Sequence, residues 1–209
     1  MKQQEEQFSS GKLLPVMEEF ISLQGEGIKT GTAAYFLRVG GCDVGCYWCD
    51  VKESWDASLH PLVQTEDVIS RIKESGMQTV LITGGEPLLY PMDYLCQQLK
   101  DINVNRFLET SGSEKLSGEW EWICLSPKKN APPFPEIYSK ANELKVIITS
   151  PSDLAWAESE AKKVNPNCEI LLQPEWSKRN EITPILVSYI IENNQWKLSL
   201  QAHKYINIP

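Results

Sequence analysis

Short apolar runs alternate with polar or glycine-rich turns along most of this chain. Runs with the composition of β-strands occupy residues 33–39, 79–82, 106–108, 122–125, 144–148, 168–172 and 196–200. Helical periodicity separates several of these runs. Thr65 is placed to cap a helix in which Val68, Ile69 and Ile72 share one face, and this helix is expected to end near Gly76. Residues 151–164 and 183–193 have similar patterns and are also expected to be helices.

The alternation of strands and helices predicts a parallel sheet with helical crossovers, and therefore an α/β protein. About six such units fit into 209 residues, fewer than the eight of a closed β/α barrel of ~250 residues. We therefore expect one domain over residues 1–209, folded as a partial, open TIM-like β/α barrel with about six parallel strands. Residues 1–12 are mostly polar and are expected to form a flexible arm.

Polar and glycine-rich motifs directly follow the strand-like runs. In parallel α/β folds the carboxyl ends of the strands meet at one edge of the sheet, where function collects. We therefore expect these motifs to form a single active site. They are GGC at 40–42, TGGEP at 83–87, ETSG at 109–112, SPK at 126–128 and QPEW at 173–176.

Composition argues against several classes of protein. The net charge of −8 predicts no general attraction to nucleic acid. No apolar run approaches the ~20 residues of a membrane span, and the first residues lack the apolar stretch of a secretory leader. We expect a cytoplasmic protein that binds neither nucleic acid nor membranes. Its cysteines should then be free, and Cys96, Cys124 and Cys168, which stand singly among apolar neighbours, are expected to be buried thiols.

The other three cysteines share one short segment with the spacing Cys42-x3-Cys46-x2-Cys49. Three thiolates fit a 4Fe–4S cluster whose fourth iron is left open to a non-protein molecule. A structural zinc site usually takes four ligands, but this chain has no second CxxC pair and only two histidines, His60 and His203. The spacing favours iron–sulfur, with zinc and unligated thiols as the alternatives.

With Trp48 before the third cysteine, the segment resembles the Cys-x3-Cys-x-aromatic-Cys motif of the radical S-adenosylmethionine (SAM) superfamily. Residues 83–87 resemble the GGEP turn of the same superfamily. The resemblance implies that the three cysteines hold a 4Fe–4S cluster whose open iron chelates SAM. It also implies that SAM is cleaved to a 5′-deoxyadenosyl radical, which abstracts a hydrogen from the substrate. Gly85 and Glu86 would orient SAM.

Further segments resemble one family of this superfamily, the 7-carboxy-7-deazaguanine synthases, over almost the whole chain from about Phe20 to Pro209. They include LQGEG at 23–27 and LSLQAHKYI at 198–206. The resemblance implies a lyase that converts 6-carboxy-5,6,7,8-tetrahydropterin to 7-carboxy-7-deazaguanine with loss of ammonia, a step of queuosine and 7-deazapurine biosynthesis. SAM would be regenerated in each turnover.

The resemblance also assigns residues to the two ligands of this reaction. Arg38, whose guanidinium can grip a carboxylate with two hydrogen bonds, would anchor the carboxylate of the substrate. The implied substrate-binding residues are Leu23, Gln24, Gly25, Arg38, Thr83 and Pro209. The implied cofactor-binding residues are Trp48, Cys49, Asp50, Gly85, Glu86, Ser126, Pro127, Lys128, Gln173, Pro174, Glu175 and Trp176.

One position departs from the family pattern. After the third cysteine the family commonly has Asp followed by Thr or Ser, whose hydroxyl helps to bind Mg2+, whereas this chain has Asp50 followed by Val51. Valine has no oxygen donor, and Mg2+ requires near-octahedral oxygen coordination. We expect Mg2+ to bind weakly here or to be replaced by another arrangement.

The resemblance further implies a homodimer and a reducing electron donor of the flavodoxin type. Two other functions are open at this point. One is a radical SAM enzyme that activates a glycyl-radical enzyme, and the other is a non-catalytic module with zinc bound to the three cysteines.

Overall fold

One curved sheet of nine strands organises the molecule. The computed structural model describes the backbone of residues 2–209 and the side chains from Glu5 onward. The strand order is β3-β1-β2-β4-β5-β6-β7-β8-β9. The bounds are β1 Leu13–Leu23, β2 Ala33–Val39, β3 Leu62–Gln64, β4 Thr79–Gly84, β5 Asn105–Thr110, β6 Trp122–Leu125, β7 Glu143–Ile148, β8 Glu169–Pro174 and β9 Trp196–Leu198. From β2 to β9 every neighbouring pair is parallel, whereas β1 runs antiparallel to both β2 and β3.

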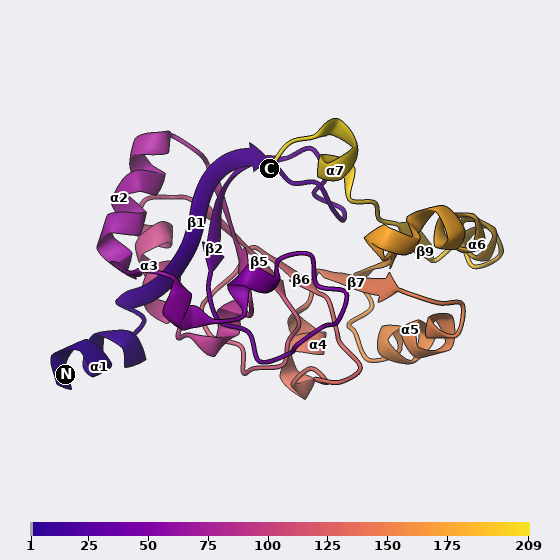
Figure 1. Ribbon diagram of the computed structural model, residues 1–209, viewed down its shortest axis with the longest axis horizontal. Coiled ribbons are helices and arrows are strands. Elements are labelled where there is room, and N and C mark those ends of the chain that lie inside the picture. The colour runs from indigo at the N-terminus through magenta and orange to yellow at the C-terminus, as the bar shows by residue number, and fades with distance from the viewer. Residues whose placement is uncertain (1) are drawn as a thin grey trace.

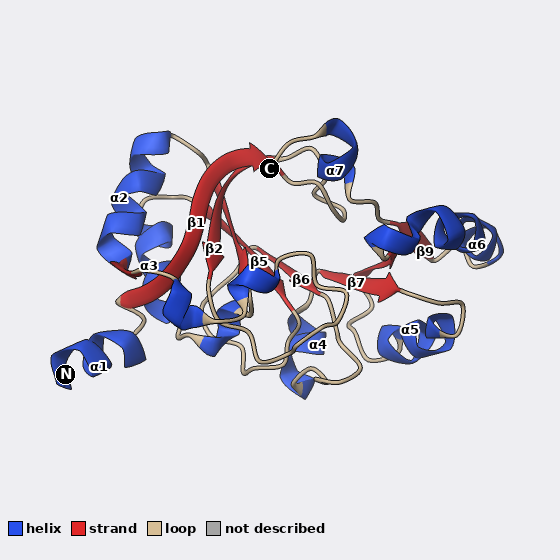
Figure 2. Ribbon diagram, in the orientation of Figure 1, coloured by secondary structure: helices blue, strands red, loops and turns tan. Residues whose placement is uncertain are grey.

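Helices α2 to α6 lie on the outer side of this sheet, whereas α7 lies across its open side (Figure 1). The curved strands do not close into a barrel (Figure 2). The order of strands has β3 at one end and β9 at the other, so the sheet is open. The helices are α1 Lys2–Ser9, α2 Thr65–Ser75, α3 Asp93–Asp101, α4 Pro135–Lys140, α5 Asp153–Ala161, α6 Arg179–Glu192 and α7 Ala202–Ile206. The prediction of an open, partial β/α barrel is confirmed, with seven parallel strands where about six were expected.

The two faces of the sheet differ in what they bury. Successive side chains of a strand point to opposite faces. On β2, Leu37 and Val39 belong to the main hydrophobic core under the helices, whereas Phe36 joins a small apolar cluster with Leu81 on the inner face. On β7, Val146 belongs to the main core in the same way. The polar residues between these core positions are therefore turned to the inner face, which is where the site lies.

Strand β1 was not expected from the sequence pattern. It carries a proline, Pro15, and two adjacent acids, Glu18 and Glu19, and it shows a register shift between Val16 and Glu18. Such an irregular strand does not have the uninterrupted apolar run of a central parallel strand. The acids are accommodated by partners on other elements, since Glu19 accepts hydrogen bonds from Arg71 and from Tyr35.

The structure also corrects several predicted helix limits. The expected helix over 151–164 spans Asp153–Ala161, and that expected over 183–193 begins a turn earlier at Arg179, with Pro184 inside it. Thr65 is the first residue of α2 and does not cap it, because its hydroxyl donates to the carbonyl oxygen of Gly11 at 2.7 Å. A tertiary hydrogen bond has thus taken the place of the local one.

Part of the expected flexible arm over residues 1–12 forms a helix, α1, in the described structure; Met1 lies outside the described residues. The ring of Phe8 contacts that of Tyr90 edge to face, with a centroid separation of 5.4 Å. None of the helices in residues 2–209 is long and apolar enough to cross a membrane.

Candidate active site

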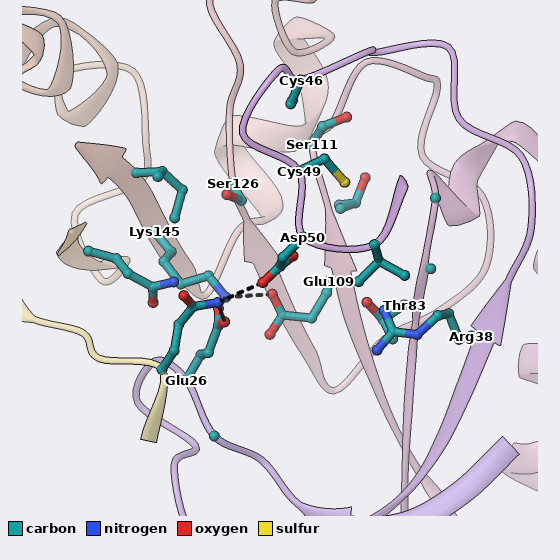
Figure 3. A pocket seen from close by; sticks show the side chains of 18 of the residues that line it. Glu26, Arg38, Cys46, Cys49, Asp50, Thr83, Glu109, Ser111, Ser126 and Lys145 are labelled. Atoms are coloured by element: carbon teal, nitrogen blue, oxygen red, sulfur yellow. Dashed lines mark hydrogen bonds and ion pairs between the residues drawn. The ribbon is translucent and has the colours of Figure 1, made fainter. Parts of the chain in front are cut away.

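The motifs that follow the strands surround one cavity of about 290 Å3. This volume is near the lower end of the range of small-molecule sites. Every residue that the sequence assigned to the cluster, to SAM or to the substrate lines this cavity except Pro127. Figure 3 shows side chains from the cysteine segment and from the strands converging on the same space. The expectation of a single site at the carboxyl ends of the strands therefore agrees with the geometry.

The cysteine segment and the GGEP turn are packed directly against each other. The backbone N–H of Gly85 donates to the carbonyl oxygen of Val39 at 3.0 Å, and that of Glu86 donates to the carbonyl oxygen of Gly41 at 2.8 Å. A Cβ atom at Gly85 would lie 1.9 Å from the Gly41 oxygen and 2.9 Å from the Cβ of Cys42. Only glycine fits there, so the turn depends on this residue to approach the first cysteine.

The three cysteines are half-buried and line the cavity together. Burial raises the pKa of the Cys42 and Cys46 thiols, and the Lys128 ammonium acts in the opposite direction on Cys46. In the described residues no three His, Cys, Asp or Glu side chains are already gathered as a metal site. The three thiols nevertheless supply the soft donors that an iron–sulfur cluster requires, from one loop facing one cavity. Cys96 and Cys124 are buried free thiols, as predicted, whereas Cys168 is only partly buried.

The Glu86 carboxylate is held inside the protein. One of its oxygens accepts hydrogen bonds from the Leu88 N–H at 3.1 Å and the Thr110 hydroxyl at 2.5 Å. The other accepts from the N–H and the hydroxyl of Ser111, at 2.8 and 2.5 Å. These four bonds occupy the four lone-pair sites of a carboxylate. Glu86 therefore fastens the ETSG turn to the GGEP turn, and its direct contact with SAM stays a prediction.

Arg38 and Thr83 lie side by side on neighbouring strands and both line the cavity. The Nε of Arg38 is 2.6 Å from a carboxylate oxygen of Glu18. This bond fixes the guanidinium through its Nε and leaves its two terminal nitrogens available as a fork. Two stacked rings, Phe20 and Phe36, line the cavity next to Arg38, with centroids 4.9 Å apart and planes inclined by 5°. The sequence did not indicate which aromatic residues would face a flat ligand.

The end of the chain closes over the segment that contains Gln24 and Gly25. The hydroxyl of Ser22 donates to the carbonyl oxygen of Pro209 at 3.0 Å, and the N–H of Ala202 donates to that of Gly25 at 2.7 Å. A Cβ at Gly25 would lie 2.2 Å from a ring nitrogen of His203. Pro209 and His203 both line the cavity, and the contact of Pro209 with the substrate stays a prediction.

The segments assigned to SAM also line this cavity. The Lys128 Nζ donates to the hydroxyl oxygen of Ser126 at 2.9 Å and lies 5.5 Å from the ring centroid of Trp48. Pro127 does not line the cavity, although both of its neighbours do. The Glu175 carboxylate caps the short 3-10 helix Trp176–Lys178 by accepting from the Ser177 N–H at 2.9 Å. These bonds hold the turns rigid, so that their exposed groups face the cavity in fixed positions.

A buried ion cluster forms the floor of the cavity, and sequence reasoning missed it. The Lys145 Nζ lies 2.6 Å from Glu26 and 2.9 Å from Glu109 (Figure 3). Lys145 belongs to β7, Glu109 to β5 and Glu26 to the loop after β1. The one local signal was a lysine inside the otherwise apolar run LKVII, because a charge at an inner strand position needs a partner.

Comparisons with known proteins agree with this geometry. The model of the radical SAM superfamily matches residues 37–145. The chain is 55% identical to the 7-carboxy-7-deazaguanine synthase of Flavobacterium psychrophilum, over 95% of this chain and 94% of that one. It is 44% identical to the synthase of Synechocystis sp., over 93% of both chains. The crystal structure of QueE from Escherichia coli superposes with a TM-score of 0.81 at 30% identity, covering 94% of this chain and 97% of that one.

The chain belongs to the 7-carboxy-7-deazaguanine synthase family. This confirms the resemblance stated from the cysteine, GGEP, LQGEG and C-terminal segments. Membership of the radical SAM superfamily implies a 4Fe–4S cluster and SAM, and the three half-buried thiols beside the GGEP turn fit that cluster. It also rules out the non-catalytic zinc module and favours the synthase over the glycyl-radical activase.

A Mg2+ site of the kind implied for 7-carboxy-7-deazaguanine synthases does not fit the residues present here. The side chain of Val51 has no oxygen, its carbonyl oxygen already accepts from Ser54, and the Asp50 carboxylate is engaged as well. One of its oxygens accepts from the Gln201 Nε2 at 3.2 Å and also from the Lys204 ammonium. Lys204 lies on α7 and is fixed further by the Trp176 ring, 5.0 Å away. A lysine thus neutralises the acid that would otherwise attract a cation.

Proposed function

We propose that this chain converts 6-carboxy-5,6,7,8-tetrahydropterin to 7-carboxy-7-deazaguanine with release of ammonia. The observation that carries the proposal is the convergence of three thiols, an arginine fork and a pair of acids bound to a buried lysine on one cavity. The relatives that match nearly the whole chain carry the name of this activity. Family membership adds weight because it was established independently of this geometry.

The residues divide by chemistry between two ligands. A carboxylate on the substrate matches the two free terminal nitrogens of Arg38, which a guanidinium presents in a fixed plane. The pterin edge carries N–H donors, and it matches the acceptors on the cavity floor together with the Thr83 hydroxyl. The stacked pair of Phe20 and Phe36 offers an apolar surface to the flat ring.

Cys42, Cys46 and Cys49 would hold the cluster, and the turns that contain Gly85, Ser126 and Gln173 would hold SAM. When bound, these groups supply one-electron reduction and hydrogen-atom abstraction. The protein has to exclude water and hold the substrate hydrogen toward SAM. The closed C-terminal segment serves this purpose, because Pro209 and His203 complete the wall of the cavity.

We further propose that turnover here does not depend on Mg2+. The Lys204 ammonium on Asp50 supports this, as does the absence of an oxygen donor at Val51. We also propose, from the same family resemblance, a homodimer, a flavodoxin-like electron donor, a single domain and a cytoplasmic location.

The test is anaerobic reconstitution with iron and sulfide, followed by addition of dithionite, SAM and 6-carboxytetrahydropterin, with products read by mass spectrometry. We expect 7-carboxy-7-deazaguanine to form while SAM is largely preserved. Formation of 5′-deoxyadenosine without that product would support the radical chemistry but refute the assignment of the substrate. Failure to incorporate iron would refute both.

A further inference from the structure

Lys145 is an unusual residue for the middle of a parallel strand, because it is only 4% exposed and carries a charge. Its Nζ is shared by one oxygen of Glu26 and one oxygen of Glu109. These acids come from segments 119 and 36 residues away from Lys145 in the chain. No assigned cofactor or substrate role involves this lysine, yet it lines the cavity between the two acids (Figure 3).

Each acid is held at both of its oxygens. The second oxygen of Glu26 accepts from the Gln201 Nε2 at 2.8 Å, and that of Glu109 accepts from the Gln24 Nε2 at 2.8 Å. A carboxylate has about four lone-pair sites, so these contacts leave further acceptor capacity on both groups. The two carboxylates therefore stand in fixed orientations with unused acceptors beside the cavity.

Among the described residues, Lys145 is the cation that forms ion pairs with Glu26 and Glu109. Burial raises the pKa of Glu143 and of Cys124, which lie on β7 and β6. Burial also lowers the pKa of Lys128, after β6, and of His203, on α7. In each case burial favours the neutral form, so Lys145 is the cation that most directly compensates the acids.

The effect of Lys145 on its partners is visible at Glu26. Burial alone would raise the pKa of this carboxyl, but the charge and hydrogen bond of Lys145, followed by hydrogen bonds from Gln201 and Gln173, outweigh it and lower the pKa to about 2. Without the ammonium, two neighbouring carboxylates that are largely shielded from solvent would not both stay ionised, since like charges and desolvation favour protonation of one of them. A protonated carboxyl donates at one oxygen and no longer offers two equivalent acceptors.

We propose that Lys145 is a positioning residue that holds Glu26 and Glu109 as a fixed pair of ionised acceptors, and so selects ligands whose edge carries N–H donors. A tetrahydropterin has such an edge, with an amino group and ring N–H groups. The inference rests on the proposed function for the identity of the ligand. It differs from that function in assigning the selection to a lysine that need not touch the ligand.

The test uses cluster-loaded Lys145→Met, Lys145→Arg and the control Lys197→Met. Lys197 is the matched control because it pairs with Glu169 on the neighbouring strands β9 and β8, with half of its side chain exposed. Two readouts are needed: the KM for 6-carboxytetrahydropterin, and the affinity for the unreactive probe 6-carboxypterin. Uncoupled cleavage of SAM without substrate is measured in parallel as a check on the cluster and on SAM binding.

We expect Lys145→Met to weaken the binding of both substrate and probe by about ten- to a hundredfold. This is the loss that follows when one or two hydrogen bonds to charged acceptors are disrupted. Uncoupled SAM cleavage should be retained. Because the defect comes from a proton on the acid pair, affinity of Lys145→Met should recover as pH rises and the pair ionises. The parent protein and Lys197→Met should lack this dependence, and Lys145→Arg should restore much of the affinity.

Two further results separate the possible failures. If the parent protein binds neither compound, the proposed function is wrong. If it binds both and Lys145→Met binds them equally at every pH, the function stands and the inference about Lys145 is overturned. If Lys145→Met does not fold, the double variant Lys145→Met/Glu26→Gln replaces it, because this variant removes one acid together with the lysine. The double variant should fold and bind both compounds weakly. Affinity equal to that of the parent protein would refute the proposal.

Discussion

Replacing Arg38 by alanine should separate substrate binding from radical chemistry. The guanidinium is held by Glu18 through its Nε, at 2.6 Å, so its two terminal nitrogens face the cavity already oriented. Two hydrogen bonds to a charged group, at about 1.5–3 kcal/mol each and not fully additive, give an expected loss of about 3–4 kcal/mol. At about 1.4 kcal/mol per tenfold change, this is about a 10²- to 10³-fold loss in kcat/KM.

The same substitution should hardly affect folding. The Arg38–Glu18 pair is partly solvated, with 18% and 45% of the two side chains exposed. Such a pair contributes about 0–1 kcal/mol to the free energy of unfolding. The loss should therefore appear in the KM for 6-carboxytetrahydropterin and not in the amount of folded, cluster-loaded protein.

The assay compares Arg38→Ala with Arg71→Ala. Arg71 is the matched control because it forms an equivalent pair with Glu19, the next residue of β1, and lies on α2 away from the cavity. Iron content and uncoupled SAM cleavage should be unchanged in both variants. An unaltered KM in Arg38→Ala would refute the assigned role, and so would loss of the cluster, because Arg38 would then act on the fold and not on the substrate.

Three shorter predictions address the cluster, the metal and the fold. Cys46→Ala should lose iron incorporation and SAM cleavage while keeping the parent far-ultraviolet circular dichroism, and retention of a full cluster would contradict its role as a ligand. Removing Mg2+ with a chelating resin should leave the turnover of the parent protein unchanged, whereas turnover of Val51→Thr/Lys204→Met should increase on addition of Mg2+. A strong requirement of the parent protein for Mg2+ would disprove the proposed independence from this metal. Burial would raise the pKa of Asp153, but hydrogen bonds from Lys129 and the Thr149 turn outweigh it and lower the pKa to about 2, from 3.8. A lowered pKa stabilises the fold above pH 4 by about 2 kcal/mol, so Asp153→Asn should unfold at lower urea concentration at pH 7, with the difference shrinking as pH falls from about 4 to 2.

Local patterns predicted the parallel strands well because their evidence lies within a few consecutive residues. The runs that became β2 and β6 match the observed limits, and the other parallel strands differ only at their ends. Prediction failed where distant partners decide the outcome. Thr65 looked like a helix cap but bonds to Gly11, and the acids of β1 obscured a strand that Arg71 and Tyr35 make possible.

The site shows the same division. The spacing of the three cysteines, the GGEP turn and the order of the polar motifs are properties of the sequence alone. They were enough to indicate the family, with its 4Fe–4S cluster and SAM, and nearly every residue that they assigned to the site lines the cavity. The floor of the cavity was decided by the fold. Lys145 meets Glu26 across 119 residues, Lys204 meets Asp50 across 154, and Pro209 meets Ser22 across 187. Such pairs cannot be predicted from a short segment, because the residues meet only after the strand order and register of the sheet are set. A charged side chain that is then buried is stable only where an oppositely charged partner lies next to it.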